Sequence, residues 1–241
     1  MSSEQTLDPR WVRALIRREQ LALVGRLLQG LRHNISGAVQ MIRLPLDLME
    51  MQLLQGKALD MTTKLDALKK GALRLDQELD LLSEKSIQLQ RTGPEVFDLF
   101  QMAHQQLDFW RADMFYKHDV DLRLELASDS ALVQAAYQDV ALAFNCLVIN
   151  ALEALRASEK RGLSLRSGLG PEGPWLVVAD EAGGPTPEIR PRMFEPFVTD
   201  KGEEHDGLGL FLAQEALAPW QGRLEWVEEP LAGFRLSLPP A

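Results

Sequence analysis

The sequence predicts an α+β protein in which an N-terminal helical hairpin, forming a dimeric four-helix bundle, precedes an α/β two-layer sandwich. Two observations predict this architecture. Apolar residues recur at alternating steps of three and four in two successive runs, which is typical of helices with a heptad seam. Beyond these runs, short alternating segments typical of half-buried strands are mixed with apolar helical runs.

The N-terminal part of the chain carries the two heptad seams. The first places apolar residues at Leu21, Val24, Leu28, Leu31, Ile35, Ala38 and Ile42, and Pro45 and Met49 continue its register. The second, after a break at Gln55-Gly56-Lys57, places them at Met61, Leu65, Leu68, Ala72, Leu75, Leu79 and Leu82. Two such helices with a short connection form an antiparallel hairpin. Because a lone hairpin covers only part of these stripes, we expect a homodimer built on residues of about 15–88.

A domain boundary is expected at Arg91-Thr92-Gly93-Pro94, because proline cannot continue a helix and glycine favours its end. The predicted domains are residues 1–91, a helical hairpin, and residues 94–241, a sandwich. In the second domain, strands are expected at 120–126, 163–169, 175–179, 223–227 and 234–238, and helices at 132–155 and 208–217. Their irregular alternation favours one sheet covered on one face by helices.

The composition excludes several classes of function. The chain has 241 residues with 35 acidic and 26 basic side chains, a formal net charge of −9. Because neutralising phosphates requires clustered cations, we expect no nucleic-acid partner. A single cysteine, Cys146, excludes an intramolecular disulfide. No apolar run approaches the roughly 18–20 residues of a membrane span and the polar N-terminus is no secretory signal, so we expect a cytoplasmic protein without a membrane span.

His33 stands out on the first helix by its position. If Leu28 and Leu31 occupy seam positions a and d, His33 falls at position f, which faces solvent. An exposed imidazole on a rigid helix can act as a nucleophile towards a phosphoryl donor, although a surface histidine without function would occupy the same position. The other histidines lack partners at metal-ligand spacing and are interpreted as surface or packing residues: His104, His118 and His205.

The segment Glu19–Ile42 resembles the dimerisation and phosphoacceptor helix of two-component sensor histidine kinases, whose phosphorylated histidine lies in a pattern such as AHEIxNPL. The resemblance implies that His33 is the phosphoacceptor. Asn34 stands where the family usually has an acidic residue that serves as general base or orients the imidazole. An amide can accept a hydrogen bond from the imidazole but cannot take its proton near neutral pH. We therefore expect weaker autophosphorylation or the use of a different group.

Asn145–Ala154 reads NCLVINALEA and resembles the N box of the ATP-binding domain of these kinases, which shares its fold with gyrase-type ATPases. The second asparagine of that motif binds Mg²⁺, a role that maps onto Asn150. One amide oxygen suffices, because water and nucleotide phosphates complete the shell of the ion. Cys146 occupies the place of the first asparagine, so Asn145 is one position out of register and is as consistent with a hydrogen-bonded core residue as with a functional one.

Asp180-Glu181-Ala182-Gly183-Gly184 follows an apolar strand and resembles the G1 box, DxGxG. By this resemblance, Asp180 accepts a hydrogen bond from the adenine amine and Gly184 lets the backbone approach the base. Ala182 replaces the first glycine, which adds a methyl group at a point of close approach or special φ and ψ.

Arg192–Lys201 reads RMFEPFVTDK and resembles the F box, LFEPFFTTK, the most specific of these matches. Phe194 and Phe197 would anchor a lid over the nucleotide, and Lys201 would reach its phosphates as a point charge.

Asp206–Phe211 reads DGLGLF and resembles the G2 box, in which Gly207 and Gly209 leave backbone N–H groups free to cradle phosphates at the start of a helix. His205 replaces the first glycine of that box. The carboxylates of Glu203, Glu204 and Asp206 make the lid acidic, so we expect reduced nucleotide affinity unless Mg²⁺ or solvent screens them.

The hairpin and the four boxes together resemble an ATP-dependent protein-histidine kinase with ATP and Mg²⁺ as cofactors. Such a protein would autophosphorylate His33 from Mg-ATP and pass the phosphoryl group to an aspartate of a response regulator receiver domain. The main alternative is a histidine phosphotransferase or pseudokinase scaffold on the same fold with impaired ATP binding. A regulatory docking protein and a serine kinase of the anti-sigma type are further alternatives. No length remains for a sensory module, so we expect the input to come from a separate sensor protein.

Overall fold

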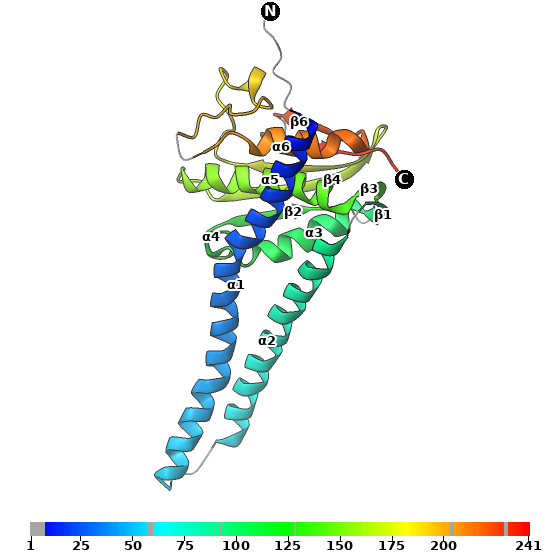
Figure 1. The fold of residues 1–241 in the computed structure, drawn as a ribbon. Coiled ribbons are helices and arrows are strands. Elements are labelled where there is room, and N and C mark those ends of the chain that lie inside the picture. Colours follow the sequence, from blue (N-terminus) through cyan, green and yellow to red (C-terminus); the bar gives the residue numbers. More distant parts are fainter. Residues whose placement is uncertain (1–7, 57–59, 92, 128, 203–204, 229–230) are drawn as a thin grey trace, which may run out of the picture.

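The computed structural model describes residues 8–56, 60–91, 93–127, 129–202, 205–228 and 231–241. Two long helices, α1 (Pro9–Leu54) and α2 (Met61–Gln90), form an antiparallel hairpin that extends away from a mixed α/β unit (Figure 1). The N-terminal part of α1 lies across the α/β unit, whereas α2 ends beside α3 (Leu99–Trp110) (Figure 1). The hairpin is therefore joined to the α/β unit by packing as well as by the chain.

Capping aspartates start both hairpin helices. Asp8 Oδ1 accepts a hydrogen bond from the Arg10 N–H at 2.8 Å, and Asp60 Oδ1 accepts one from the Thr63 N–H at 3.2 Å. Each bond satisfies a backbone donor that has no partner within the helix. The predicted break between the helices is observed after α1, and its residues 57–59 lie outside the described residues.

The residues of α1 that are buried within one chain match the predicted seam in part. Leu21 and Leu28, which were expected to face the bundle core, are 68% and 51% exposed. Leu31, Ala38 and Pro45 of the predicted seam are buried, together with Val12, Ile16, Leu23, Leu27 and Asn34, which lie outside it. The additional residues are buried because the N-terminal part of α1 packs against the α/β unit, a contact that heptad spacing alone does not reveal.

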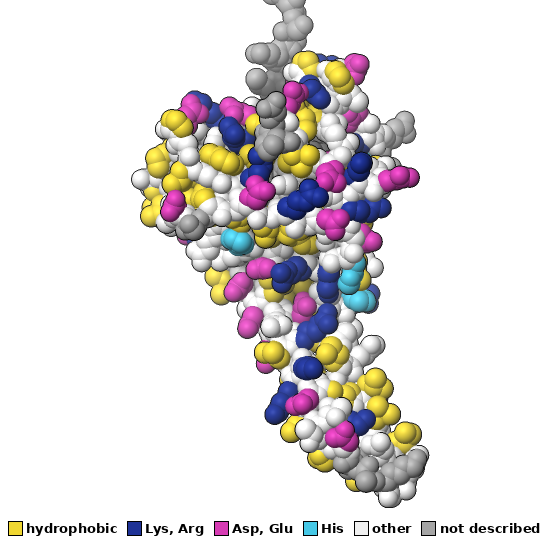
Figure 2. Space-filling view, turned by 180° about the vertical axis from the view of Figure 1, so that it is seen from behind, with side chains coloured by type: hydrophobic (Ala, Val, Ile, Leu, Met, Phe, Trp, Pro, Cys, Tyr) yellow, Lys and Arg dark blue, Asp and Glu magenta, His cyan; other side chains and the backbone are white. Residues whose placement is uncertain are grey.

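A single chain leaves many apolar side chains of the hairpin uncovered. On α2, Met61, Leu65 and Leu79 of the predicted seam are exposed, whereas Gly71, Lys85 and Gln88 are buried. Hydrophobic side chains also lie exposed towards the free end of the hairpin (Figure 2), among them Leu44, Leu53 and Leu54. The hairpin of one chain is therefore only partly packed.

The α/β unit contains a five-stranded sheet. Its strands lie in the order β2 (Asp121–Glu125), β4 (Gly162–Gly170), β5 (Gly173–Asp180), β7 (Gly233–Ser237) and β6 (Arg223–Val227). The β2–β4 pair is parallel and the other pairs are antiparallel. Helices α5 (Tyr137–Arg156) and α6 (Gly209–Leu217) contact the sheet, which confirms the predicted two-layer α+β fold. The remaining short elements are α4 (Met114–His118), η1 (Arg190–Arg192) and η2 (Ala218–Trp220).

The prediction of one helix over 132–155 was wrong at its start. Residues Leu132–Ala136 form strand β3, which pairs antiparallel with β1 (Pro94–Asp98) in a separate two-stranded sheet. The strand was concealed because it has only five residues and α5 begins at the next residue, so no turn marks the boundary between them. Strand β1 and the helices α3 and α4 were not predicted.

A buried polar network connects α2 with α3 and α5. The Gln106 Oε1 atom accepts hydrogen bonds from Lys85 Nζ at 2.7 Å and from Asn145 Nδ2 at 2.9 Å. Asn145 Oδ1 in turn accepts a hydrogen bond from Trp110 Nε1 at 2.8 Å. Asn145 is therefore a core asparagine with its polar atoms satisfied, which decides between the two interpretations of this residue.

Helix α5 is the core helix of the α/β unit. Among the described residues it is the one helix whose length and mean hydropathy, 1.3 over an 18-residue window, would allow it to cross a membrane. The sequence-based statement that no such run exists was therefore wrong. Since 72% of the window is buried inside the protein, the apolar side chains of α5 form the core between the sheet and the other helices.

Candidate functional site

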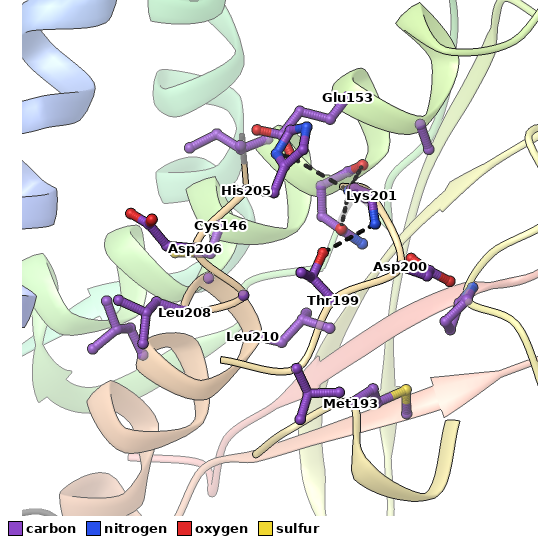
Figure 3. Close-up of a pocket in the computed structure, with 18 of the residues that line it drawn as sticks. Cys146, Glu153, Met193, Thr199, Asp200, Lys201, His205, Asp206, Leu208 and Leu210 are labelled. Atoms are coloured by element: carbon purple, nitrogen blue, oxygen red, sulfur yellow. Dashed lines mark hydrogen bonds and ion pairs between the residues drawn. The ribbon is translucent and has the colours of Figure 1, made fainter. Parts of the chain in front are cut away.

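A cavity of about 500 Å³ lies where α1, α5, α6 and the segment between β5 and α6 meet. We call the described residues of that segment, 181–202 and 205–208, the lid. The cavity is lined by all six residues that the motifs assigned to ATP or Mg²⁺: Asn150, Asp180, Gly184, Lys201, Gly207 and Gly209. Its volume lies within the range of about 300–1,000 Å³ that is usual for ligand pockets. Figure 3 shows part of its lining, with lid residues facing α5.

Asp180 ends strand β5 at the wall of the cavity. Its Oδ1 atom accepts a hydrogen bond from the Ala182 N–H at 2.9 Å. Burial raises the pKa of its carboxyl group, while this hydrogen bond and the charge of Lys201 act in the opposite direction. The carboxylate is thus held by the backbone beside the cavity, where it can accept a further donor such as an exocyclic amine.

The turn after Asp180 needs glycine at its end but not at its start. Gly183 and Gly184 have φ values of 101° and 74°, whereas Ala182 has no positive φ. A Cβ at Gly184 would lie 2.0 Å from the Trp226 ring. The alanine in place of the first glycine of the G1 box is therefore accommodated without backbone strain, and only the last glycine is sterically required.

The two glycines of the predicted phosphate cradle differ in their surroundings. Gly207 has a φ of 63°, and a Cβ there would lie 2.8 Å from backbone atoms of Phe197 and Val198. Gly209 begins α6, and a Cβ built on it would meet no described atom within 4 Å apart from its chain neighbours and the backbone of its own helix. Among the described residues, no side chain caps the N-terminus of α6. Open space in front of free N–H groups is the geometry that a phosphate group requires.

Lys201 and Asn150 meet at the α5 side of the cavity. The Lys201 ammonium donates to the Asn150 backbone oxygen at 3.0 Å, to Asn150 Oδ1, and to Glu153 Oε2 at 3.3 Å. Figure 3 shows Glu153, Lys201 and His205 directed towards one another. Carboxylate and amide oxygens are the donors that Mg²⁺ prefers, and here they already surround a positive charge, so these residues fit the ion that the resemblance implies.

Glu153 is a site residue that the sequence did not predict. Besides Lys201, it contacts His205 Nδ1 at 3.4 Å through Oε2 and Arg26 Nη1 at 3.8 Å through Oε1. It therefore connects α5 with the lid and with the hairpin helix α1. The signal that could have found it is its position three residues after Asn150, which places both side chains on one face of α5. His205, which was interpreted as a surface or packing residue, is half-buried and lines the cavity.

The two phenylalanines of the F box do not act as a pair. Phe194 packs edge-to-face against Phe234 with ring centroids 6.3 Å apart, which anchors the lid to the sheet. Phe197 is 67% exposed and has a φ of 66°, with its N–H bonded to the Gly207 oxygen at 3.0 Å. The expected anchoring by both rings was therefore wrong for Phe197.

His33 is exposed on α1 and does not line the cavity. Leu15, Glu19, Ala22 and Arg26 of α1 do line it. His33 follows Arg26 by seven residues, so it lies on the same face of the helix, about 10 Å further along the axis. The structure therefore places the imidazole in line with the cavity but two turns away from its edge.

Asn34 is buried, and its side-chain amide is hydrogen-bonded to other side chains. Its Oδ1 atom accepts a hydrogen bond from Lys117 Nζ at 2.9 Å, and its Nδ2 atom donates to Glu78 Oε2 at 3.4 Å. Asn34 thus connects α1 with α2 and α4, while a Cβ at the neighbouring Gly30 would overlap the Ala112 oxygen. These contacts hold the α/β unit against the hairpin next to His33.

Comparisons with known proteins agree with this architecture. The family of histidine kinase-, DNA gyrase B-, and HSP90-like ATPases matches residues 136–241. The C4-dicarboxylate transport sensor protein DctB of Rhizobium meliloti (strain 1021) is 26% identical over 218 residues, which cover 88% of this chain and 34% of that protein. The chain thus spans about a third of the length of this curated relative.

Solved structures share the fold at low sequence identity. The catalytic domain of histidine kinase ThkA matches 61% of this chain and 98% of its own with 19% identity and a TM-score of 0.51. Full-length ShkA in complex with AMPPNP matches 90% of this chain and 47% of its own with 17% identity and a TM-score of 0.50. Residues 136–241 are thus similar to the histidine kinase-, DNA gyrase B- and HSP90-like ATPases, and most of the chain is similar to part of a sensor protein.

Proposed function

We propose that the protein is a cytoplasmic histidine kinase that binds Mg-ATP in the cavity, transfers the γ-phosphoryl group to His33, and passes it to an aspartate of a response regulator receiver domain. One observation carries the proposal. Residues from four motifs, spread over 60 positions between Asn150 and Gly209, line a single cavity with open space at the N-terminus of α6.

Each of these residues has a distinct part in binding. Asp180 accepts a hydrogen bond from the adenine amine, and the first N–H groups of α6 bind phosphate oxygens. Asn150 contributes its side-chain oxygen to Mg²⁺, which would neutralise charge on the phosphates. The Phe194 contact with the sheet keeps the lid over the cavity. Because phosphoryl transfer needs little covalent assistance, positioning and charge neutralisation are the main contributions of the chain.

At His33, a neutral ring nitrogen forms the new N–P bond while the bond from the γ-phosphorus to the bridging oxygen breaks and ADP leaves. The displacement of about 10 Å between Arg26 and His33 means that the nucleotide domain slides along α1, or that the cavity of a second chain serves His33. The exposed apolar side chains of the hairpin support a homodimer, in which a second copy would cover them. A separate sensor protein would supply the input.

Labelled ATP tests the proposal directly. Wild-type protein incubated with Mg²⁺ and γ-³²P-ATP should acquire acid-labile, alkali-stable label, and His33→Gln should lose it while still binding ADP. The matched control is His104→Gln, because His104 is also exposed on a helix but lies away from the cavity. Label that persists on His33→Gln would refute the assignment of the phosphoacceptor.

A histidine phosphotransferase that receives its phosphoryl group from another protein is the second candidate. Two observations favour it: Lys201 donates to the oxygen assigned to Mg²⁺, and Asn34 is bonded to Lys117 and Glu78 rather than placed to assist His33. Calorimetric titration with Mg-ADP separates the two candidates, because a kinase must bind the nucleotide and a phosphotransferase need not.

A further inference from the structure

Three oxygen atoms of α5 converge on a single cation of the lid. The Lys201 ammonium bonds the backbone and side-chain oxygens of Asn150 and Oε2 of Glu153. These contacts use all three N–H groups of the ammonium. The position between the three oxygens is thus a cation site formed by two residues of α5 and filled by a side chain of the lid (Figure 3).

The chemistry of this position suits a divalent ion as well as an ammonium. Amide and carboxylate oxygens are hard ligands, and Asn150 and Glu153 present theirs from one face of α5. A divalent ion and the Lys201 ammonium cannot both bind the same three oxygens, because the two positive charges would repel each other strongly. Binding of the ion therefore requires the lysine to leave.

We propose that Lys201 is the resident cation of this position and is exchanged for the divalent ion when Mg-nucleotide binds, with Glu153 as a second ligand beside Asn150. The inference rests on the proposed function for the nucleotide, but it concerns the affinity of the α5 oxygens for cations. Glu153 Oε2 is the carboxylate oxygen that is exchanged, since Arg26 lies beside Oε1.

The exchange also accounts for the acidic character of the lid. Lys201 shares the cavity with Gly207 and Gly209, so the released ammonium can pair with the phosphates at the N-terminus of α6. The site then holds the divalent ion and Lys201 together, which offsets carboxylates such as Asp200 and Asp206. The Lys201 contacts with Asn150 and Glu153 hold the lid against α5. Release of the lysine therefore couples metal binding to a rearrangement of the lid.

Titration of the full-length protein with Mn²⁺ alone, followed by the electron paramagnetic resonance signal of free Mn²⁺, tests the proposal without nucleotide. Lys201→Met should bind Mn²⁺ about ten-fold more tightly than wild type, the smallest effect expected when a neighbouring like charge is removed. Lys201→Arg keeps the positive charge and should bind no more tightly than wild type. Lys160→Met is the matched control, because it removes an exposed lysine outside the cavity.

A double variant tests the second ligand. Adding Glu153→Gln to Lys201→Met should abolish the ten-fold gain, because the negative charge of the carboxylate is then lost. If Lys201→Met binds Mn²⁺ with wild-type affinity, or if neither protein binds it detectably, the competition does not exist and the proposal is overturned. This outcome is distinct from failure of the proposed function, which is measured by ADP titration and by label on His33.

Discussion

The hairpin and the domain formed by the α/β unit bury their apolar residues in different ways. In the domain, large side chains such as Trp110, Tyr137 and Phe144 are buried within the same chain. In the hairpin, Leu28, Leu44 and similar side chains remain exposed, and part of the buried stripe of α1 faces the domain. The domain therefore specifies its own packing, whereas the packing of the hairpin is incomplete in one chain. A second copy, as proposed, would complete it.

The largest effect should come from breaking the self-contained packing of the domain at Gly184. In Gly184→Ala, the new methyl group would lie 2.0 Å from the Trp226 ring while φ is 74°. We expect a loss of roughly 3 kcal/mol or more in the free energy of unfolding, together with loss of ADP binding, because strain and overpacking add. Thermal unfolding and ADP titration measure the two effects.

Gly183→Ala is the matched control for this substitution. Gly183 has a φ of 101°, but no described residue lies within 4 Å of a Cβ built on it. In this control the free energy of unfolding should therefore fall by only roughly 1–2 kcal/mol, the cost of the backbone strain. Equal losses in the two variants would show that contact with Trp226 does not determine this turn.

The next effect concerns the uncovered face of the hairpin. Leu28→Glu places a charge on an apolar side chain that is 51% exposed in one chain. If a second copy covers this face, the dissociation constant of the dimer should rise about 100-fold, as for a residue at the centre of an interface. Sedimentation velocity over a concentration series measures the change.

Gln29→Glu adds the same charge to the adjacent exposed position, and it should leave the dimer intact. The thermal unfolding temperature of the α/β unit should be unchanged in both variants. A Leu28→Glu protein that dimerises like wild type would show that the exposed stripe has a different partner.

Prediction from the sequence succeeded where the signal is local. Strand β6 was predicted with its observed bounds, Arg223–Val227, because alternation and flanking turns lie within the segment itself. Strand β3 was missed because α5 begins directly after it, with no turn residue between them. The burial of α1 residues outside the seam was not predicted because contacts with the α/β unit, such as the Arg13 ion pair with Asp139, come from residues 126 positions away.

The same distinction applies to the site. The four motifs predicted which residues line the cavity, since glycines and an aspartate in a fixed order after strands and before a helix specify loops at one end of a sheet. The sequence could not predict that Glu153 meets Lys201 and His205, because these contacts arise from the fold of the lid. The contacts of Asn34 with Glu78 and Lys117, 44 and 83 positions away, were equally beyond local patterns.

A smaller effect tests the close contact within the hairpin. A Cβ at Gly71 of α2 would lie 2.7 Å from Ile42 Cγ1 and 3.1 Å from Ile42 N of α1. Gly71→Ala should therefore lower the free energy of unfolding by about 1–3 kcal/mol despite the better helix propensity of alanine. A Cβ at Gly25 of α1 would contact no residue outside its own helix within 4 Å among the described residues. Gly25→Ala should therefore raise the free energy of unfolding by about 0.5–1 kcal/mol. Urea denaturation of both variants measures the difference, and a gain in both would show that the helices do not touch at Gly71.

The smallest effect sits at the junction of the two regions, where Lys85 of α2 donates to Gln106 Oε1 at 2.7 Å and lies 4.7 Å from the centroid of the Phe109 ring. Burial lowers the pKa of Lys85 to about 8. The unfolded chain keeps this proton to higher pH, so stability rises with pH above about 8 until the lysine of the unfolded chain also titrates. Between about pH 7 and pH 9, the free energy of unfolding of the wild type should rise by about 1 kcal/mol relative to that of Lys85→Met. Lys69→Met, which removes an exposed lysine of the same helix, should show the same rise as the wild type. The comparison between proteins removes the opposing contribution of Cys146, whose thiol pKa is raised by burial in all of them. If urea denaturation gives the same difference at both pH values, Lys85 is solvated, and the junction between hairpin and domain is open rather than packed.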